Sequence, residues 1–110
     1  MSRRRGAVYF ADLGPQLGRK PVLVVSTAPI NAGLHQPLCA LITSRDRKRT
    51  VPTFVPIDPP EGGLREPSFV LCHHLLTLRE DLIDPEPQGV LTAFTMLEVD
   101  EALKVALDLT

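Results

Sequence analysis

The chain has 110 residues, 44% of them hydrophobic and 23% charged, which is typical of one globular domain (residues 1–110) and excludes a disordered chain. Its apolar runs are far shorter than the roughly 18–20 residues of a membrane-spanning helix, and its basic N-terminus lacks the apolar segment of a secretion signal. We therefore expect a cytoplasmic protein with no membrane partner. The net charge of −1, taken alone, argues against nucleic-acid binding.

The charges are distributed unevenly along the chain. Residues 1–50 carry nine cations and two acids, a balance of +7, whereas residues 51–110 carry three cations and eleven acids, a balance of −8. This segregation predicts one basic and one acidic face if the two halves fold side by side.

Short apolar segments dominate the first three quarters of the chain. They predict five or so strands, at residues 7–13, 21–27, 38–44, 50–57 and 68–77. The continuous apolar segment 21–27 is expected to be buried on both faces, and Pro52 and Pro56 indicate that 50–57 is an edge or bent strand. Because the connections are too short for helical crossovers, the strands should pair antiparallel.

The periodicity changes near the C-terminus, where "LTAFTMLEVDEALKVALDL" predicts an amphipathic helix. Its apolar stripe would comprise Met96, Val99, Leu103, Ala106 and Leu107. Thr92 is a plausible N-cap, with Thr95 and Glu98 as an alternative capping box. An ion pair between Asp100 and Lys104 is expected on the outer face. The fold class is therefore mainly β with a C-terminal helix, arranged as a small barrel.

The sequence contains no pattern for a cofactor. Cys39 and Cys72 are far apart in apolar surroundings, which favours buried free thiols over a zinc site or a disulfide. "GGL" at 62–64 reads as a turn and not as a phosphate-binding loop. We expect no metal and no other cofactor.

The candidate chemistry lies at the ends of two neighbouring strands. Lys20 precedes Pro21, which restricts its backbone, and Thr43 and Ser44 end the third predicted strand. If segments 21–27 and 38–44 form an antiparallel hairpin, Lys20 and Thr43 come to the same end. A cation beside a hydroxyl is suited to a phosphodiester. The alternative is a solvated turn lysine beside an ordinary strand threonine.

Other polar clusters have competing interpretations. The basic segment 3–5 reads as a loose basic arm or a solubilising tail, and segment 45–49 as a basic loop or a solvated connection. Strand alternation sends His73 and His74 to opposite faces, so that one of them can enter a given pocket as an acid, a base or a base-edge donor. Either is otherwise an ordinary core or surface histidine.

Six segments together resemble the MazF/PemK family of toxins from toxin–antitoxin modules. From about residue 5 to the end, they are "RRGAVYFADLG", "KPVLVVS", "ALITS", "PTFVPI", "GGLREPSFVLC" and "VDEALKVALDL", in that order. The resemblance implies a homodimer with an SH3-like barrel that cuts single-stranded RNA at a short motif without a metal. It also implies 2′,3′-cyclic phosphate and 5′-hydroxyl ends, growth inhibition, and an antitoxin with an acidic disordered segment.

The family's motifs map onto particular residues. Its catalytic basic residue and threonine match Lys20 and Thr43, although the family usually has arginine before the proline, so that Arg19 is an alternative cation. The expected RNA-binding residues are Ser26, Thr27, Ser44, Arg45 and His74. The first loop, "GPQLG", is shorter than the commonest family form.

The sequence is also compatible with two functions other than a nuclease. One is a binding module on the same barrel, such as an inhibitor of DNA gyrase, which needs no cationic groove. The other is a degenerate toxin that binds its antitoxin but no longer cuts RNA.

Overall fold

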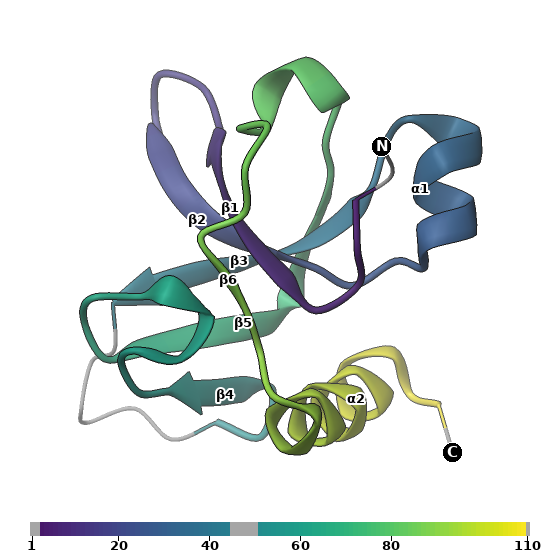
Figure 1. Ribbon diagram of the computed structural model, residues 1–110. Helices are drawn as coiled ribbons and strands as arrows, with labels where there is room; N and C mark the ends of the chain where they lie inside the picture. The colour runs from purple at the N-terminus through teal and green to yellow at the C-terminus, as the bar shows by residue number, and fades with distance from the viewer. Residues whose placement is uncertain (1–2, 45–50, 110) are drawn as a thin grey trace.

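A curled antiparallel sheet with a C-terminal helix forms the fold (Figure 1). The computed structural model describes residues 3–44 and 51–109. Its strands and helices are β1 (Ala7–Asp12), β2 (Arg19–Val24), α1 (Ala28–Leu34), β3 (Leu38–Ser44), β4 (Phe54–Ile57), β5 (Ser68–Thr77), β6 (Gly89–Val90) and α2 (Ala93–Leu107), with short 3-10 helices at Glu61–Gly63 and Glu80–Leu82.

The strands follow the order β4-β5-β3-β2-β1-β6, and every pairing between them is antiparallel. The mainly-β class, the antiparallel pairing and the edge position of β4 are confirmed. The short strand β6, which pairs with Ala7 and Val8 of β1, is an addition to the five expected. The sheet curls into a half-barrel.

Alternate residues of the central strands enter two different cores. Val8, Leu23 and Ile42 pack with Val99 and Ala102 of α2 on one face of the sheet. On the other face a second cluster surrounds residues such as Tyr9, Val22 and Leu41. Strand β2 is therefore covered on both sides, as its continuous apolar sequence predicted.

The two cysteines are divided between these cores, and both are free and buried as expected. Burial raises the pKa of the Cys39 thiol to about 12 and that of Cys72 to about 11. Both thiols are therefore protonated and unreactive at neutral pH.

Helix α2 begins at the predicted N-cap, but its buried stripe and its ion pairs differ from the prediction. The Thr92 hydroxyl accepts a hydrogen bond from the backbone N–H of Thr95, which confirms Thr92 as the N-cap. Val99 is buried as expected, but Leu107 is 51% exposed and is not part of the packed stripe. The expected Asp100–Lys104 pair is wrong, because Lys104 pairs with Glu101 and Asp100 pairs with an arginine from the N-terminal segment.

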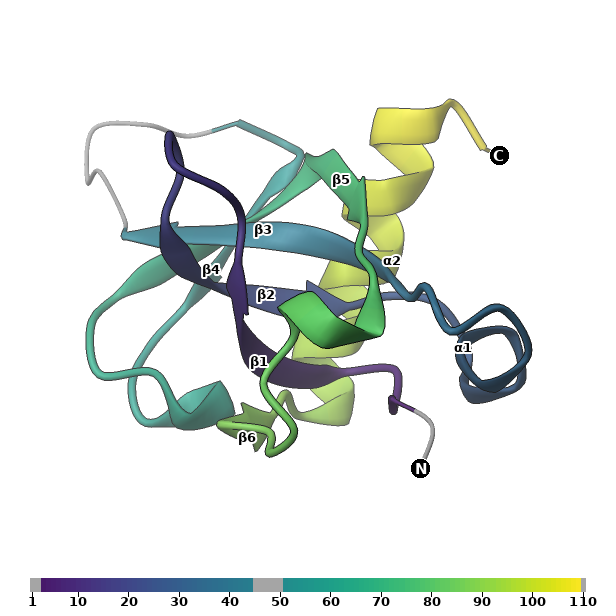
Figure 2. The same cartoon turned by 90° about the horizontal axis from the view of Figure 1, so that it is seen from above.

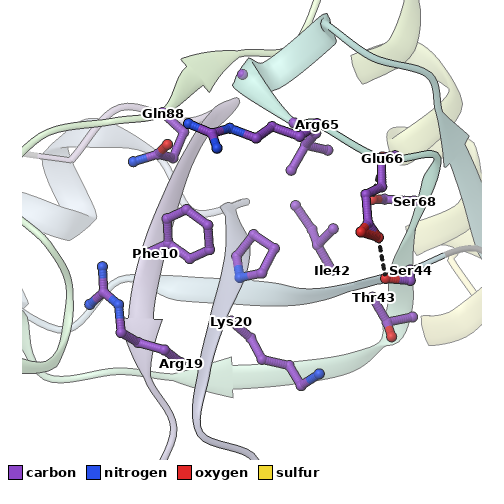
Figure 3. Close-up of a pocket in the computed structure, with 13 residues that line it drawn as sticks. Phe10, Arg19, Lys20, Ile42, Thr43, Ser44, Arg65, Glu66, Ser68 and Gln88 are labelled. Atoms are coloured by element: carbon purple, nitrogen blue, oxygen red, sulfur yellow. Dashed lines mark hydrogen bonds between the residues drawn. The ribbon is translucent and has the colours of Figure 1, made fainter.

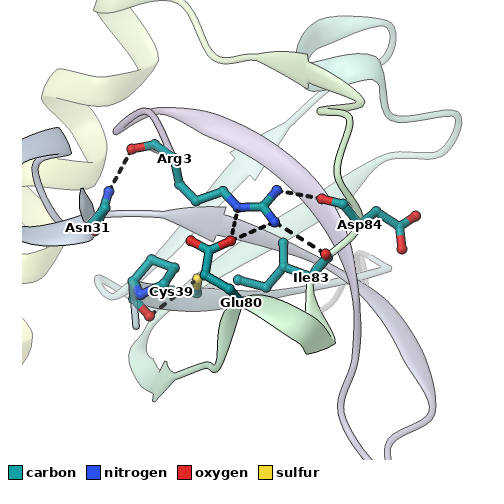
Figure 4. Close-up of polar contacts among 7 residues, drawn as sticks. Arg3, Asn31, Cys39, Glu80, Ile83 and Asp84 are labelled. Carbon is teal, nitrogen blue, oxygen red and sulfur yellow. Dashed lines mark hydrogen bonds and ion pairs between the residues drawn. The ribbon is translucent and has the colours of Figure 1, made fainter. Parts of the chain in front are cut away.

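Two of the N-terminal arginines, Arg3 and Arg5, are structural, so the interpretation of segment 3–5 as a loose basic arm is wrong for them. Arg3 is 8% exposed, pairs with Glu80 at 2.8 Å and donates to the carbonyl oxygens of Ile83 and Asp84 (Figure 4). Its guanidinium also lies over the Tyr9 ring, 4.7 Å from the centroid. Arg3 therefore ties segment 80–84 to the start of the chain.

Further ion pairs join the basic half of the chain to the acidic half. Arg5 donates to the carbonyl of Val25 and to Asp100, and Arg19 pairs with Asp84. For these residues, unlike charges from the two halves meet instead of forming separate faces. Arg5 and Arg19 therefore do not belong to a separate basic face, and the prediction of one basic and one acidic face is wrong for these two residues.

Strand β5 contains a large irregularity at the two histidines. Leu71 pairs with Leu41, but the neighbouring residue Ala40 pairs with Leu75, so that residues 72–74 form a bulge. His73 is exposed, stacks on Phe54 and shares a hydrogen bond with Thr53. Simple strand alternation does not apply across this bulge.

Candidate active site

A cavity of about 480 Å³ lies where β1, β2 and β3 meet the turn after the Glu61–Gly63 helix (Figure 3). Residues 63–66 supply one side, and Gln88 reaches it from the segment before β6. Gly63 is required in this turn, because its φ is +72° and a Cβ atom would stand 2.1 Å from the Gln88 carbonyl oxygen. The close approach of these two backbones positions the far wall of the cavity.

Lys20 and Thr43 both line this cavity. Val22 pairs with Leu41 at this end of the β2–β3 ladder. If the same register is extended by two residues, Lys20 comes opposite Thr43 and shares a face of the sheet with it. In Figure 3 the Lys20 side chain runs toward Thr43. Within the described residues neither side chain has a hydrogen-bond or ion-pair partner, so both are available to a ligand.

Arg19 occupies a different environment from its neighbour. It forms two hydrogen bonds with the Asp84 carboxylate, at 2.8 and 2.5 Å, and lies over the Phe10 ring at 5.3 Å. This hydrogen bonding raises the pKa of Arg19 and lowers that of Asp84. Arg19 also lines the cavity, but strand alternation places it on the face opposite Lys20, where its charge is matched by Asp84.

The expected RNA-binding residues are only partly brought together. Ser44 lines the cavity and donates a hydrogen bond to Glu66 at 3.1 Å. Ser26 and Thr27 lie past the other end of β2, at the start of α1, and α1 and the β1–β2 loop lie at opposite ends of the sheet in Figures 1 and 2. The Ser26 hydroxyl bonds Asn31 and accepts from the Leu38 backbone N–H.

Two further predicted residues are not part of the described cavity. His74 is half-buried in the β5 bulge and does not line it. Arg45 lies outside the described residues. For both, a role in RNA binding stays a prediction.

The cavity also contains residues that the sequence did not single out, namely Phe10, Arg65, Glu66 and Gln88. The aromatic residue in the first predicted strand was a usable signal for Phe10. Nothing local in the sequence indicated that residues 65–66 and Gln88 would meet the start of β2. In the part of the chain that the structure describes, no cluster of three His, Cys, Asp or Glu could hold a metal ion, and no helix is long and apolar enough to span a membrane.

A curled antiparallel sheet with a polar cavity at one end of its central hairpin defines a small β protein with a candidate active site. Comparison with known proteins makes this more specific. The profile of the family described as "PemK-like, MazF-like toxin of type II toxin-antitoxin system" matches residues 4–107. The chain belongs to this family, which confirms the resemblance found in the sequence.

Individual relatives agree with this assignment. Endoribonuclease EndoA of Bacillus subtilis (strain 168) is 35% identical over 111 residues, covering 96% of this chain and 95% of EndoA. A mycobacterial endoribonuclease solved in complex with its cognate antitoxin has a TM-score of 0.86 and 32% identity, covering 99% of this chain and 98% of its own. Mycobacterium tuberculosis toxin MazF-mt6 has a TM-score of 0.82 and 28% identity, covering 94% and 98%.

Proposed function

We propose that this toxin-family protein is an endoribonuclease that cuts single-stranded RNA by transesterification, using Lys20 and Thr43. The observation that carries the proposal is the position of these two side chains. They lie opposite each other on neighbouring strands, at a cavity, and are unpaired among the described residues. The endoribonucleases among the relatives support the reaction class.

The proposed reaction uses groups of the RNA itself. The 2′-hydroxyl loses its proton and attacks the adjacent phosphorus, the bond from phosphorus to the 5′-oxygen breaks, and that oxygen gains a proton. The ends are a 2′,3′-cyclic phosphate and a 5′-hydroxyl. Lys20 stabilises the negative charge that develops on the phosphate oxygens, and Thr43 donates a hydrogen bond to the phosphate.

The surrounding fold gives this pair its fixed geometry. Pro21 restricts the backbone of Lys20, and the residues that follow in β2 are fully buried. Thr43 stands on β3, which pairs with β2 on one side and with β5 on the other. Donors held in this way need little reorganisation when charge develops, which is what electrostatic catalysis requires.

The proposed macromolecular partners are an antitoxin and a second copy of the chain. A relative of similar structure was solved with its cognate antitoxin, and we propose an antitoxin whose acidic disordered segment competes with RNA for the Lys20 end of the sheet. The homodimer is proposed from the family, and the exposed apolar residues of α2 supply a surface for it.

Cleavage of a long single-stranded RNA in the presence of EDTA tests the proposed function. Wild type, Lys20→Ala and Thr43→Ala are compared, with chemical mapping of the new ends. We expect cyclic-phosphate and 5′-hydroxyl ends from the wild type and a loss of roughly 100- to 1,000-fold in rate for each variant.

The outcomes separate the possible functions. Activity that requires an added metal, or Thr43→Ala acting as fast as wild type, contradicts the proposed mechanism. A folded wild type that cuts none of several RNAs, while still binding a cognate antitoxin, points to a degenerate toxin. Inhibition of gyrase by the same protein points to the binding module.

A further inference from the structure

The cavity beside Lys20 and Thr43 has two unlike walls. On one side is the Phe10 ring, and on the other are Glu66 and Ser44 (Figure 3). A volume of about 480 Å³ accommodates a nucleotide-sized group. This pocket therefore has room for a base next to the proposed scissile phosphate.

The Phe10 ring is held in place by Arg19, which also lines the cavity. Arg19 lies over the ring and is itself fixed by two hydrogen bonds to Asp84. In Figure 3 the Phe10 ring lies between Arg19 and the interior of the cavity. The ring lines the cavity, and stacking on an aromatic ring is the usual way in which proteins hold an unpaired RNA base.

The opposite wall presents hydrogen-bond acceptors. The Ser44 hydroxyl donates its proton to Oε1 of Glu66, so its oxygen and the second carboxylate oxygen remain as acceptors side by side. A carboxylate repels a phosphate group, so an acidic side chain in a pocket for RNA is unfavourable unless it meets N–H donors. Base edges supply such donors.

The pattern of acceptors distinguishes the four bases. Guanine presents two adjacent donors, N1–H and the 2-amino group, on its Watson–Crick edge. Adenine and cytosine each present one amino group beside a ring-nitrogen acceptor, and uracil presents one N–H between two carbonyl groups. Two neighbouring acceptors therefore match guanine better than any other base, and the Arg65 side chain at the same cavity adds donors suited to its O6.

We propose that Glu66 and Ser44 form a guanine-selecting subsite, in which the base stacks on Phe10 with its Watson–Crick edge toward the carboxylate. This inference rests on the proposed nuclease function, because it places the base next to the phosphate held by Lys20 and Thr43. Glu66 and Ser44 are specificity residues in this arrangement and take no part in bond making or breaking.

Cleavage of a randomised RNA library, followed by sequencing of the ends, tests the subsite. We expect guanine at one position next to the cut for the wild type. In Glu66→Gln the preference for guanine at that position should fall roughly ten- to a hundred-fold, the scale of one good bidentate contact to a base. Glu86→Gln is the matched control, because Glu86 is an exposed carboxylate that does not line the cavity.

A substrate with inosine in place of that guanine isolates the 2-amino group. We assign the 2-amino group to the Ser44 oxygen, so the wild type should cut the inosine substrate roughly ten-fold less efficiently. Ser44→Ala should then cut the two substrates about equally. An unchanged base preference in Glu66→Gln, or a wild-type preference for uracil at every position near the cut, overturns the subsite.

Binding measurements keep this inference separate from the nuclease function. Fluorescent 2′-O-methyl oligonucleotides cannot be cut by the proposed reaction, and oligonucleotides that differ by one guanine or adenine report base selection alone. Tighter binding to the guanine form, lost in Glu66→Gln, supports the subsite even if the wild type fails to cut RNA. Equal binding of both forms contradicts it even if cleavage succeeds.

Discussion

Adjacent cations at residues 19 and 20 have different surroundings, and from this we infer different roles. Both line the cavity, but strand alternation turns them to opposite faces: Lys20 lies on the Thr43 side, whereas Arg19 pairs with Asp84 and lies over the Phe10 ring. Arg19→Ala should therefore weaken RNA binding and raise KM while leaving kcat within about ten-fold of the wild type, whereas loss of Lys20 should lower kcat itself. Steady-state cleavage kinetics on a defined RNA measure both constants.

The control for this comparison is Arg79→Ala, which removes an exposed arginine that pairs with Asp81 outside the cavity. It should leave both constants unchanged. If kcat falls strongly in Arg19→Ala and stays near the wild-type value in Lys20→Ala, Arg19 and not Lys20 is the catalytic cation.

Arg3 has a structural role that can be measured without RNA. Its guanidinium is buried and satisfies Glu80 and two carbonyl oxygens, so that Arg3→Ala leaves acceptors in a protein interior without their donor. We expect a loss of about 2 kcal/mol in the free energy of unfolding. Urea denaturation measures this loss.

Arg4→Ala is the matched control, because it removes the same charge from the exposed neighbouring position. It should change the stability by no more than about 0.5 kcal/mol. Equal losses from the two variants would mean that charge alone, and not the buried contacts of Arg3, accounts for the effect.

At the scale of elements, the start of helix α2 depends on a carboxylate from another segment. Glu61 Oε2 accepts hydrogen bonds from the backbone N–H and the hydroxyl of Thr92. Burial acts to raise the pKa of Glu61, but the hydrogen bonds from Thr92 and Thr95 outweigh it and hold the pKa below its ordinary 4.5. The folded state therefore favours the ionised form, next to the positive end of the helix dipole.

A lowered pKa in the folded state makes this contribution dependent on pH. The stabilisation is fully present above the unfolded pKa near 4.5 and is lost as the pH falls through the lower folded value. Glu61→Gln should therefore be less stable than wild type at pH 7, and the difference should shrink toward pH 3. Urea unfolding at both pH values tests this, and a difference that grows on acidification contradicts it.

Local patterns in the sequence were sufficient to predict most elements. The strands β3 and β5 have the predicted bounds, and Thr92 was identified as the cap of α2, because alternation, turn residues and caps act over a few neighbours. The Lys20–Thr43 pair was found for the same reason, since it depends on one hairpin between consecutive strands.

The features that the sequence did not predict are mainly contacts between segments far apart in the chain. The Arg3–Glu80 pair joins residues 77 positions apart, and the Glu66 wall depends on how the turn after the Glu61–Gly63 helix folds over β3. The bulge in β5 at His73 and His74 is a further feature that the alternating pattern of the sequence does not reveal. Packing across the whole sheet decides such contacts.

For the whole molecule, the outer face of α2 is the feature that a single chain leaves unexplained. Phe94 is 72% exposed and Leu97 63% exposed, with Val105 on the same helix also exposed. A groove between α2 and β4 brings these three side chains beside Phe54 and Val55. Apolar residues grouped in this way are typical of an interface between proteins, and a second copy of the chain is the occupant expected from the family.

This arrangement predicts that association of the chain depends on Leu97. Leu97→Glu places a charge in the centre of the apolar face, where an interface would have to desolvate it, so the variant should be monomeric at concentrations at which wild type is a dimer. Light scattering during size-exclusion chromatography measures the mass of each. Lys104→Glu introduces the same side chain at an exposed position on the same helix and should keep the mass of the wild type. A Leu97→Glu protein that remains dimeric would place the interface elsewhere, and a wild type that is monomeric up to high concentration would leave α2 as a surface for another partner.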